Sequence, residues 1–223
     1  MVKHQTVGQS GEMVLDTKYF YEPAKGHGLK HEPFNAIVGP RPIGWISTRA
    51  PDGRVNLAPY SFFNAFCYTP PIIGFSSTSR KDSLRNIEQT GEFVWNLVDQ
   101  KLAEAMNATS APVPYGDDEF ALAGLEKAQA SLVSAPMVAN ARVNFECKLC
   151  DIVTLKSASG VPTGAVLALG EVVGVHIDPV LIKNGVFDTF AADIVLRAGG
   201  PAAYMRVLPE ARFEMYRPRA PQS

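Results

Sequence analysis

The sequence has 223 residues, of which 46% are hydrophobic and 19% are charged, with a mean hydropathy near zero. These values exclude a disordered chain and are typical of a folded domain with a sizeable core. With 21 Lys and Arg against 22 Asp and Glu, the charge favours neither nucleic acid nor an anionic membrane, so we expect a ligand to be recognised locally.

Residues 1–33 are polar and show no clear period, which predicts an arm followed by a loop. They contain no apolar stretch long enough for a signal peptide, and the chain has no run of about 18 apolar residues that could form a membrane helix. We therefore expect a cytoplasmic protein whose three cysteines are reduced thiols.

Residues 43–59 predict two strands joined by a tight turn, because the sequence Pro-Asp-Gly at 51–53 separates two apolar runs. Residues 70–77 predict a third strand, which begins with prolines because proline cannot occupy the interior of a sheet.

A short helix is expected from about residue 83 to 89, with Leu84 and Ile87 on its inner face. The run EFVWNLVD that follows is apolar on both faces and predicts a buried strand. Asp99 then caps a helix. The inner stripe of that helix consists of Leu102, Ala105 and Met106.

The second half of the chain predicts three further strands, at residues 142–155, 165–177 and 191–199. Strands arranged in hairpins imply antiparallel pairing, so the expected fold is mainly β, a barrel with peripheral helices. The nucleotide-binding patterns GxGxxG and GxxxxGK[ST] are absent, which argues against the common dinucleotide and nucleoside-triphosphate folds.

Cys147 and Cys150 have the CxxC spacing of many metal sites. Because they lie three apart in a predicted strand, their side chains should point to opposite faces and cannot share an ion. We therefore expect two structural strand cysteines and no metal.

The stretch FSSTSRKDS at 75–83 combines cations and hydroxyls between a strand end and a helix start. Its donors are Ser76, Ser77, Thr78, Ser79, Arg80, Lys81 and Ser83. Phosphate binding uses this combination together with the free N–H groups of a helix N-terminus. The alternative is an ordinary capped turn, and Asp82 favours that alternative because a carboxylate repels phosphate.

A second polar group lies around the first hairpin, where Pro59 interrupts the strand ladder and leaves backbone groups free for a flat polar ligand. The alternative is a kinked edge strand. His176 is a lone histidine, and no nucleophilic serine or metal-ligand set accompanies it. Any chemistry is thus expected to come from an organic cofactor.

Six stretches of the sequence, taken together and in this order, resemble the flavin reductase-like family of FMN-binding split barrels. They are RPIGWIST, DGRVNLAPYSFFNAF, PPIIGFSS, RKDSLRNIEQTGEFVWNLV, GEVVGVHID and LRAGGPAAY. The similarity spans roughly residues 34–206. It divides the chain into an arm and loop at 1–33, a split-barrel domain at 34–208 and a C-terminal tail at 209–223.

The resemblance implies a six-stranded antiparallel split barrel that forms a homodimer and holds FMN near the subunit interface. The resemblance also implies roles for individual residues. The flavin would lie along Trp45, Ser47 and Thr48, and its ring would meet the backbone groups of Ala58, Pro59, Tyr60 and Ser61. Its phosphate would be bound by Arg80, Lys81 and Ser83, while Tyr204 would cover the ring and His176 would orient nicotinamide.

The implied activity is that of an NAD(P)H:flavin reductase, with hydride passing from nicotinamide to flavin N5 and the reduced flavin serving a partner such as a monooxygenase. Two alternatives stay open from the residues alone. One is a flavin-binding electron carrier without a nicotinamide site, and the other is a barrel that has lost its cofactor.

Overall fold

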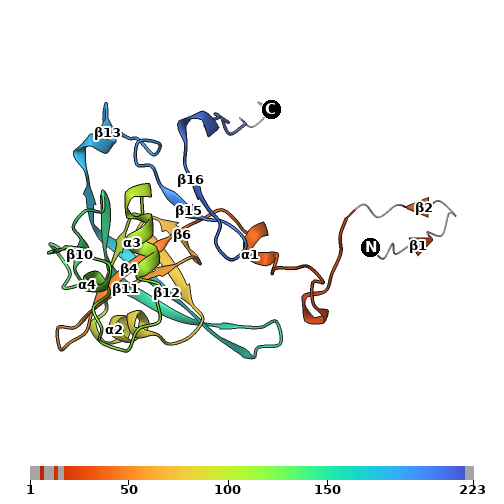
Figure 1. The fold of residues 1–223 in the computed structure, drawn as a ribbon, viewed down its shortest axis with the longest axis horizontal. Coiled ribbons are helices and arrows are strands. Elements are labelled where there is room, and N and C mark those ends of the chain that lie inside the picture. Colours follow the sequence, from red (N-terminus) through yellow and green to blue (C-terminus); the bar gives the residue numbers. More distant parts are fainter. Residues whose placement is uncertain (1–5, 8–12, 15–17, 219–223) are drawn as a thin grey trace, which may run out of the picture.

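The structure is a computed structural model that describes residues 6–7, 13–14 and 18–218. Within these residues, one antiparallel sheet of seven strands forms the body, in the order β5-β4-β8-β11-β12-β7-β6 (Figure 1). In chain order these strands are β4 (Gly44–Arg49), β5 (Val55–Tyr60), β6 (Phe63–Tyr68), β7 (Pro71–Ser77), β8 (Glu92–Asn96), β11 (Val143–Lys156) and β12 (Pro162–Ile177).

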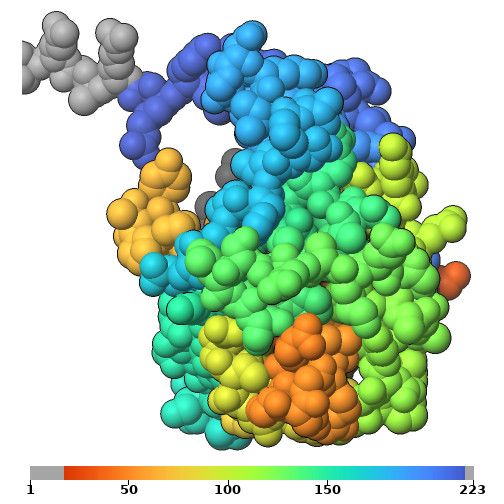
Figure 2. Space-filling model, turned by 90° about the vertical axis from the view of Figure 1, so that its left-hand side faces the viewer, coloured from red at the N-terminus to blue at the C-terminus, as the bar shows by residue number. Residues whose placement is uncertain are grey.

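Short helices and most of the small sheets lie beside this body, whereas the short strands at 6–7 and 13–14 lie away from it (Figure 1). The green segment between residues 109 and 142 covers much of one face (Figure 2). The remaining strands are β1 (Thr6–Val7), β2 (Met13–Val14), β3 (Arg41–Pro42), β9 (Lys127–Ala128), β10 (Met137–Val138), β13 (Ile182–Lys183), β14 (Val186–Phe187), β15 (Val195–Arg197) and β16 (Tyr204–Arg206). The helices are α1 (Phe34–Ile37), α2 (Asp82–Thr90), α3 (Ala103–Ala108) and α4 (Glu119–Leu122), with 3₁₀ turns η1 (Pro23–Lys25), η2 (Gln100–Leu102), η3 (Pro179–Leu181) and η4 (Pro209–Ala211).

The predicted first hairpin is confirmed as β4 and β5, which pair from Gly44 opposite Tyr60 to Arg49 opposite Val55. Gly53 adopts a φ of 91° in the connecting turn, a conformation that favours glycine. In this pairing the C-terminal half of β5 lies beside the N-terminal half of β4, with Pro59 opposite Trp45.

Helix α2 packs against β4 and β5. The predicted inner residues Leu84 and Ile87 are fully buried in the core that fills the sheet, together with Phe75 and Phe93. Burial of each such side chain contributes roughly 1.5–3 kcal/mol to the stability of the fold. This packing fixes the N-terminal end of α2 beside β5.

Two expectations about these elements need adjustment. The main sheet has seven strands in the described residues, so the expected count of six is not confirmed. The additional strand β6 pairs with β7 at the sheet edge. Asp99 does accept a hydrogen bond from the Leu102 N–H, but the turn it caps is the 3₁₀ turn η2 ahead of α3.

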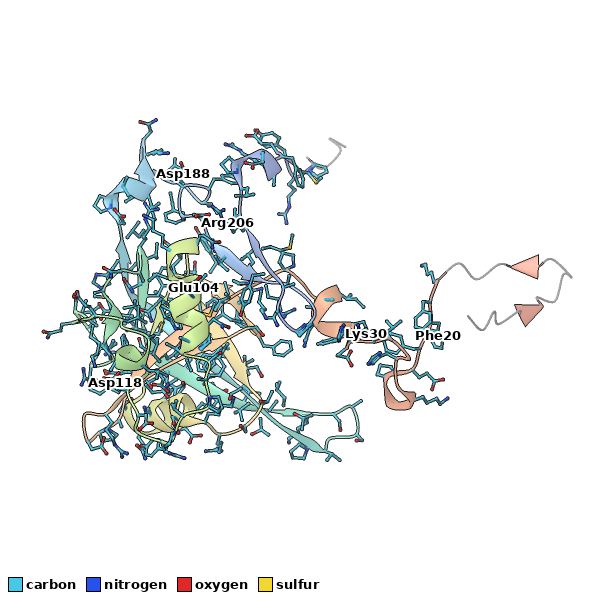
Figure 3. All side chains as sticks on the ribbon, viewed as in Figure 1. Phe20, Lys30, Glu104, Asp118, Asp188 and Arg206 are labelled. Carbon is cyan, nitrogen blue, oxygen red and sulfur yellow. The ribbon has the colours of Figure 1, made fainter. Side chains whose placement is uncertain are left out.

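The segment at 18–33 extends from the body in Figure 1, and Phe20 and Lys30 lie well away from the sheet in Figure 3. The strand predicted at residues 191–199 is shorter in the structure. Only Val195–Arg197 form a strand, β15, which belongs to a separate sheet with β3 and β16. Among the described residues, no helix is long and apolar enough to cross a membrane.

Candidate functional site

A cavity of about 580 Å³ lies over β5, between α2 and α4, and the loop at 109–115 forms one of its walls. This volume is in the range of small-molecule sites. The residues that line it are Asn56, Ala58, Pro59, Tyr60, Ser61, Phe62, Ser76, Ser77, Thr78, Lys81, Asp82, Ser83, Thr109, Ser110, Ala111, Pro112, Val113, Tyr115 and Glu119.

One wall of the cavity is rich in hydrogen-bond donors. Ser76, Ser77 and Thr78 come from the end of β7, and Lys81 and Ser83 come from the start of α2. Lys81 is the N-cap residue of α2, and no side chain in the described residues caps the N–H groups of the first turn. The helix therefore presents unpaired backbone donors next to an ammonium group, an arrangement that attracts anions.

Tyr60 also lines this cavity, and its hydroxyl is buried. Burial raises the pKa of Tyr60, and the side chains of Ser83 and Ser77 counteract part of that effect by interacting with the hydroxyl. The hydroxyl therefore keeps its proton and belongs to the same polar wall as the two serines.

Asn56, Ser83 and Glu119 form a buried polar cluster at the cavity wall. The Nδ2 of Asn56 lies 2.8 Å from the Oγ of Ser83, and the Oε2 of Glu119 accepts a hydrogen bond of 3.0 Å from the Leu57 N–H. Burial raises the pKa of Glu119, and the charges of Asp82 and Asp118 add to the effect.

The loop at 109–115 is attached to the body at its two ends. Thr109 accepts a hydrogen bond of 3.0 Å from Nε1 of Trp45. Tyr115 lies between two guanidinium groups, with Arg54 4.4 Å and Arg85 4.1 Å from its ring centroid. At exposed positions each such cation–π contact stabilises the folded arrangement by about 0.5–1 kcal/mol.

The structure brings half of the predicted site residues together. The predicted ring contacts and two of the three predicted phosphate ligands line the cavity, namely Ala58, Pro59, Tyr60, Ser61, Lys81 and Ser83. Arg80 does not line it, because its guanidinium extends along α2 and pairs with Glu88 at 2.5 Å.

Trp45, Ser47 and Thr48 lie in the interior and do not line the cavity. They belong to β4, which runs between β5 and β8, and each has its own partner. Ser47 donates to the Pro136 carbonyl, and Thr48 accepts from Nδ2 of Asn86. The described residues thus give these three side chains structural roles.

His176 does not line the cavity within one chain. It lies on β12 opposite Asn144 of β11, and strands β11, β8 and β4 separate it from Pro59 of β5 in the same register. Nε2 of His176 lies 2.5 Å from Oε1 of the buried Glu146.

Tyr204 lines a different, apolar groove between α3 and β16, where the guanidinium of Arg197 lies 4.9 Å from its ring centroid. It therefore does not meet the cavity residues within one chain.

Sequence reasoning missed the loop at 109–115 and Glu119. The hydroxyls and prolines of this loop carry no sequence pattern that places it beside β5. A buried carboxylate next to the helix cap Asp118 had no local signal either, because its partner Leu57 is 62 residues away.

The donor set fits a phosphate ester better than a metal ion. It consists of hydroxyls, an ammonium group and helix N–H groups, all of which are anion ligands. Among the described residues, no group of three or more His, Cys, Asp or Glu side chains could hold a metal.

Comparison with known proteins gives consistent matches. The model of the flavin reductase like domain matches residues 39–190. An uncharacterized protein of Halalkalibacterium halodurans is 35% identical over 179 residues, which cover 77% of this chain and 85% of that protein.

Two solved structures share the fold. Nitrilotriacetate monooxygenase component B from Bacillus cereus has a TM-score of 0.76 at 30% identity, covering 81% of this chain and 90% of that one. A Shewanella frigidimarina protein described as a flavin reductase with a split barrel domain has a TM-score of 0.73 at 28% identity, covering 82% and 89%. The predicted split barrel is confirmed.

Proposed function

Because the chain belongs to the flavin reductase-like family, we propose that it is an NAD(P)H:flavin oxidoreductase that binds FMN with its phosphate in the cavity beside α2. The observation that carries this proposal is the anion-binding wall formed by Lys81, Ser83 and the uncapped first turn of α2. The hydroxyl-bearing residues Ser76, Ser77 and Thr78 in the lining of the same cavity support it.

A bound flavin would supply the redox chemistry by accepting a hydride at N5 from the C4 of a nicotinamide. The protein's part is to bind and orient. Lys81 supplies charge to the phosphate, and Ser83 and Tyr60 supply hydroxyl donors. The backbone of residues 58–61 borders the same cavity, so the ring would lie against the end of β5. Such a reaction needs close stacking more than a protein acid or base.

We include a homodimer in this proposal. The edge strand β6 exposes Phe66 at 55% and Tyr68 at 94%, and an exposed apolar edge strand is a site for association. A second copy would cover this edge. Because His176 and Tyr204 lie apart from the cavity within one chain, a role for either at the flavin requires the partner subunit.

The experiment that tests the function combines a spectrum with an assay. The purified protein is mixed with FMN, freed of unbound flavin and examined by absorption spectroscopy, and NADH and NADPH oxidation is then followed with excess FMN. The proposal predicts retained flavin and FMN-dependent oxidation of NADH or NADPH. Retained flavin without oxidation would indicate an electron carrier. A protein that retains no flavin and is inactive would be a barrel without a cofactor.

A further inference from the structure

A second cavity, of about 440 Å³ and lined mainly by apolar side chains, has no residue in common with the proposed flavin site. We call it the Trp95 groove. The ring of Trp95 lies 5.5 Å from that of Phe63 and 4.8 Å from that of Phe145, and its Nε1 donates to the Ile43 carbonyl at 2.9 Å. Trp95 and Phe145 are only half-buried, although both lie on the central strands of the main sheet. An open aromatic groove of this kind is a binding surface.

The Trp95 groove adjoins two other features of the chain. Pro40 and Pro42, which follow α1, line the groove, and so do Asn64 and Ala65 of the edge strand β6. The groove therefore opens beside the point where the N-terminal segment 18–33 joins the body, and beside the exposed edge at which we place the homodimer contact.

The point where segment 18–33 joins the body is held firmly. Nε of Arg41 donates to the Ser61 carbonyl at 2.9 Å, and its Nη1 donates to the Val38 carbonyl at 2.6 Å. Gly199 packs so closely on α1 that an added Cβ would lie 2.3 Å from Cβ of Ala36. These contacts fix the direction in which the segment leaves the body. It leads away from the sheet and so from the groove of its own chain (Figure 3).

Segment 18–33 has an internal structure of its own. The hydroxyl of Tyr19 donates to the His27 carbonyl at 2.8 Å, the ring of Tyr21 meets that of His27 edge-on at 6.2 Å, and Nε2 of His27 lies 3.5 Å from Oε2 of Glu32. Tyr19 is nevertheless 65% exposed and Phe20 76%. A structured segment that holds two adjacent aromatic rings in solvent fits a docking role better than that of a random tail.

We propose that two copies of this chain exchange segment 18–33, with the aromatic side chains at 19–21, Phe20 above all, seated in the Trp95 groove of the second copy. In a two-fold dimer the same surface of both subunits faces the axis. A segment that begins beside its own groove and leads away from it then crosses to the identical groove of the other copy. The inference rests on the homodimer in the proposed function and names the contact that completes it.

Cross-linking tests the exchange directly. Phe20→Cys and Asn64→Cys are made in separate chains that lack the exposed thiols of Cys67 and Cys150 and carry tags of different mass. The two chains are co-expressed and oxidised with copper phenanthroline. A disulfide that joins the two differently tagged chains should appear on a non-reducing gel. Phe213→Cys paired with Asn64→Cys is the control, because Phe213 is 79% exposed but lies in the C-terminal tail, and it should not cross-link.

Tryptophan fluorescence reports on the groove without a cross-link. The chain has two tryptophans, and Trp45 is fully buried, so a change in emission comes from Trp95. Phe20→Ser should move the Trp95 emission to longer wavelength and raise the dissociation constant of the dimer by at least about tenfold, since it removes a buried aromatic side chain from the interface. Phe213→Ser should change neither quantity.

The outcomes separate this inference from the proposed function, because FMN retention is measured on the same samples. If Phe20→Cys and Asn64→Cys placed in one chain link within that chain, the segment covers its own groove and the exchange is wrong. If wild type is a dimer that retains FMN but gives no cross-link beyond the control, the exchange is wrong and the proposed function stands. A monomer that retains FMN and oxidises NADH or NADPH would overturn the dimer and the exchange and leave the flavin site.

Discussion

The indole Nε1 of Trp45 donates a hydrogen bond of 3.0 Å to Oγ1 of Thr109, and this bond joins the barrel interior to the loop that forms one wall of the cavity. Thr109 in turn donates to the Met106 carbonyl at 2.7 Å. Trp45 was predicted to lie along the flavin, and the structure gives it the role of positioning the loop.

Thr109→Val keeps the shape of the side chain and leaves the buried Trp45 N–H without its acceptor. We expect a loss of about 1–3 kcal/mol in the free energy of unfolding, measured by urea denaturation. Ser110→Ala is the control, because Ser110 is exposed and its hydroxyl donates to the Asn107 carbonyl of its own helix end. Equal stability losses in the two variants would contradict the positioning role of the Trp45 contact.

The buried Glu146 predicts a pH-dependent contribution to stability. Burial alone would raise its pKa, but hydrogen bonds from His176 and from the N–H groups of Ser131, Leu132 and Val133 outweigh burial and lower it. A depressed pKa stabilises the fold above the unfolded value of about 4.3 and loses that effect as the pH falls through the folded value.

Glu146→Gln should therefore lower the free energy of unfolding by about 1.5–3 kcal/mol at pH 7, and the difference from wild type should shrink below about pH 4. Urea denaturation at a series of pH values checks this. A difference that is constant between pH 7 and pH 3 would show that the carboxylate charge is not what stabilises the loop at 131–133.

The exposed edge of β6 predicts a homodimer. Light scattering at micromolar concentration should give twice the chain mass of 24.1 kDa. Phe66→Lys should shift the mass toward the monomer, because a lysine on an edge strand opposes pairing. Val180→Lys changes a similarly exposed apolar residue on η3 and should leave the mass unchanged. A monomeric mass for wild type would refute this prediction.

The three cysteines are free thiols and are predicted to be dispensable for flavin reduction. Cys147 of β11 is buried and Cys150 is exposed, and Cys150 lies at an irregularity of the strand, since Leu149 pairs with Gly170 and Asp151 with Leu169. Burial raises the pKa of Cys147, which keeps it an unreactive thiol. Cys67 is exposed too.

Replacement of all three cysteines by Ala should preserve FMN binding and NAD(P)H oxidation, at a stability cost on the order of 1 kcal/mol from the Cys147 site. A variant that folds and holds FMN but no longer oxidises NAD(P)H would show that a thiol takes part.

Local patterns predicted the local structure well. The Pro-Asp-Gly turn and the apolar positions Leu84 and Ile87 of α2 are signals within a few residues, and both were confirmed. The strand β6 was missed because its polar and apolar residues do not alternate regularly and five of its six positions are exposed. Edge strands owe little to burial, so their sequences carry a weak pattern.

The site was harder to predict because its contacts join distant segments. Glu119 reaches Leu57 across 62 residues, and Trp45 reaches Thr109 across 64. Periodicity contains no information on such pairs. Nor could it show which of two adjacent cations faces the cavity: Lys81, the N-cap of α2, lines it, whereas Arg80 pairs with Glu88.

That difference between two neighbouring cations gives the most direct test of the phosphate site. FMN and riboflavin are titrated into wild type, Lys81→Ala and Arg80→Ala, and flavin fluorescence is followed. A hydrogen bond to a charged group contributes roughly 1.5–3 kcal/mol, so Lys81→Ala should weaken FMN binding by about ten- to a hundredfold and leave riboflavin affinity nearly unchanged. Arg80→Ala should weaken FMN binding by less than about threefold, because Arg80 pairs with Glu88 and does not line the cavity. If Lys81→Ala weakens both flavins equally, or neither, the cavity beside α2 does not hold the FMN phosphate.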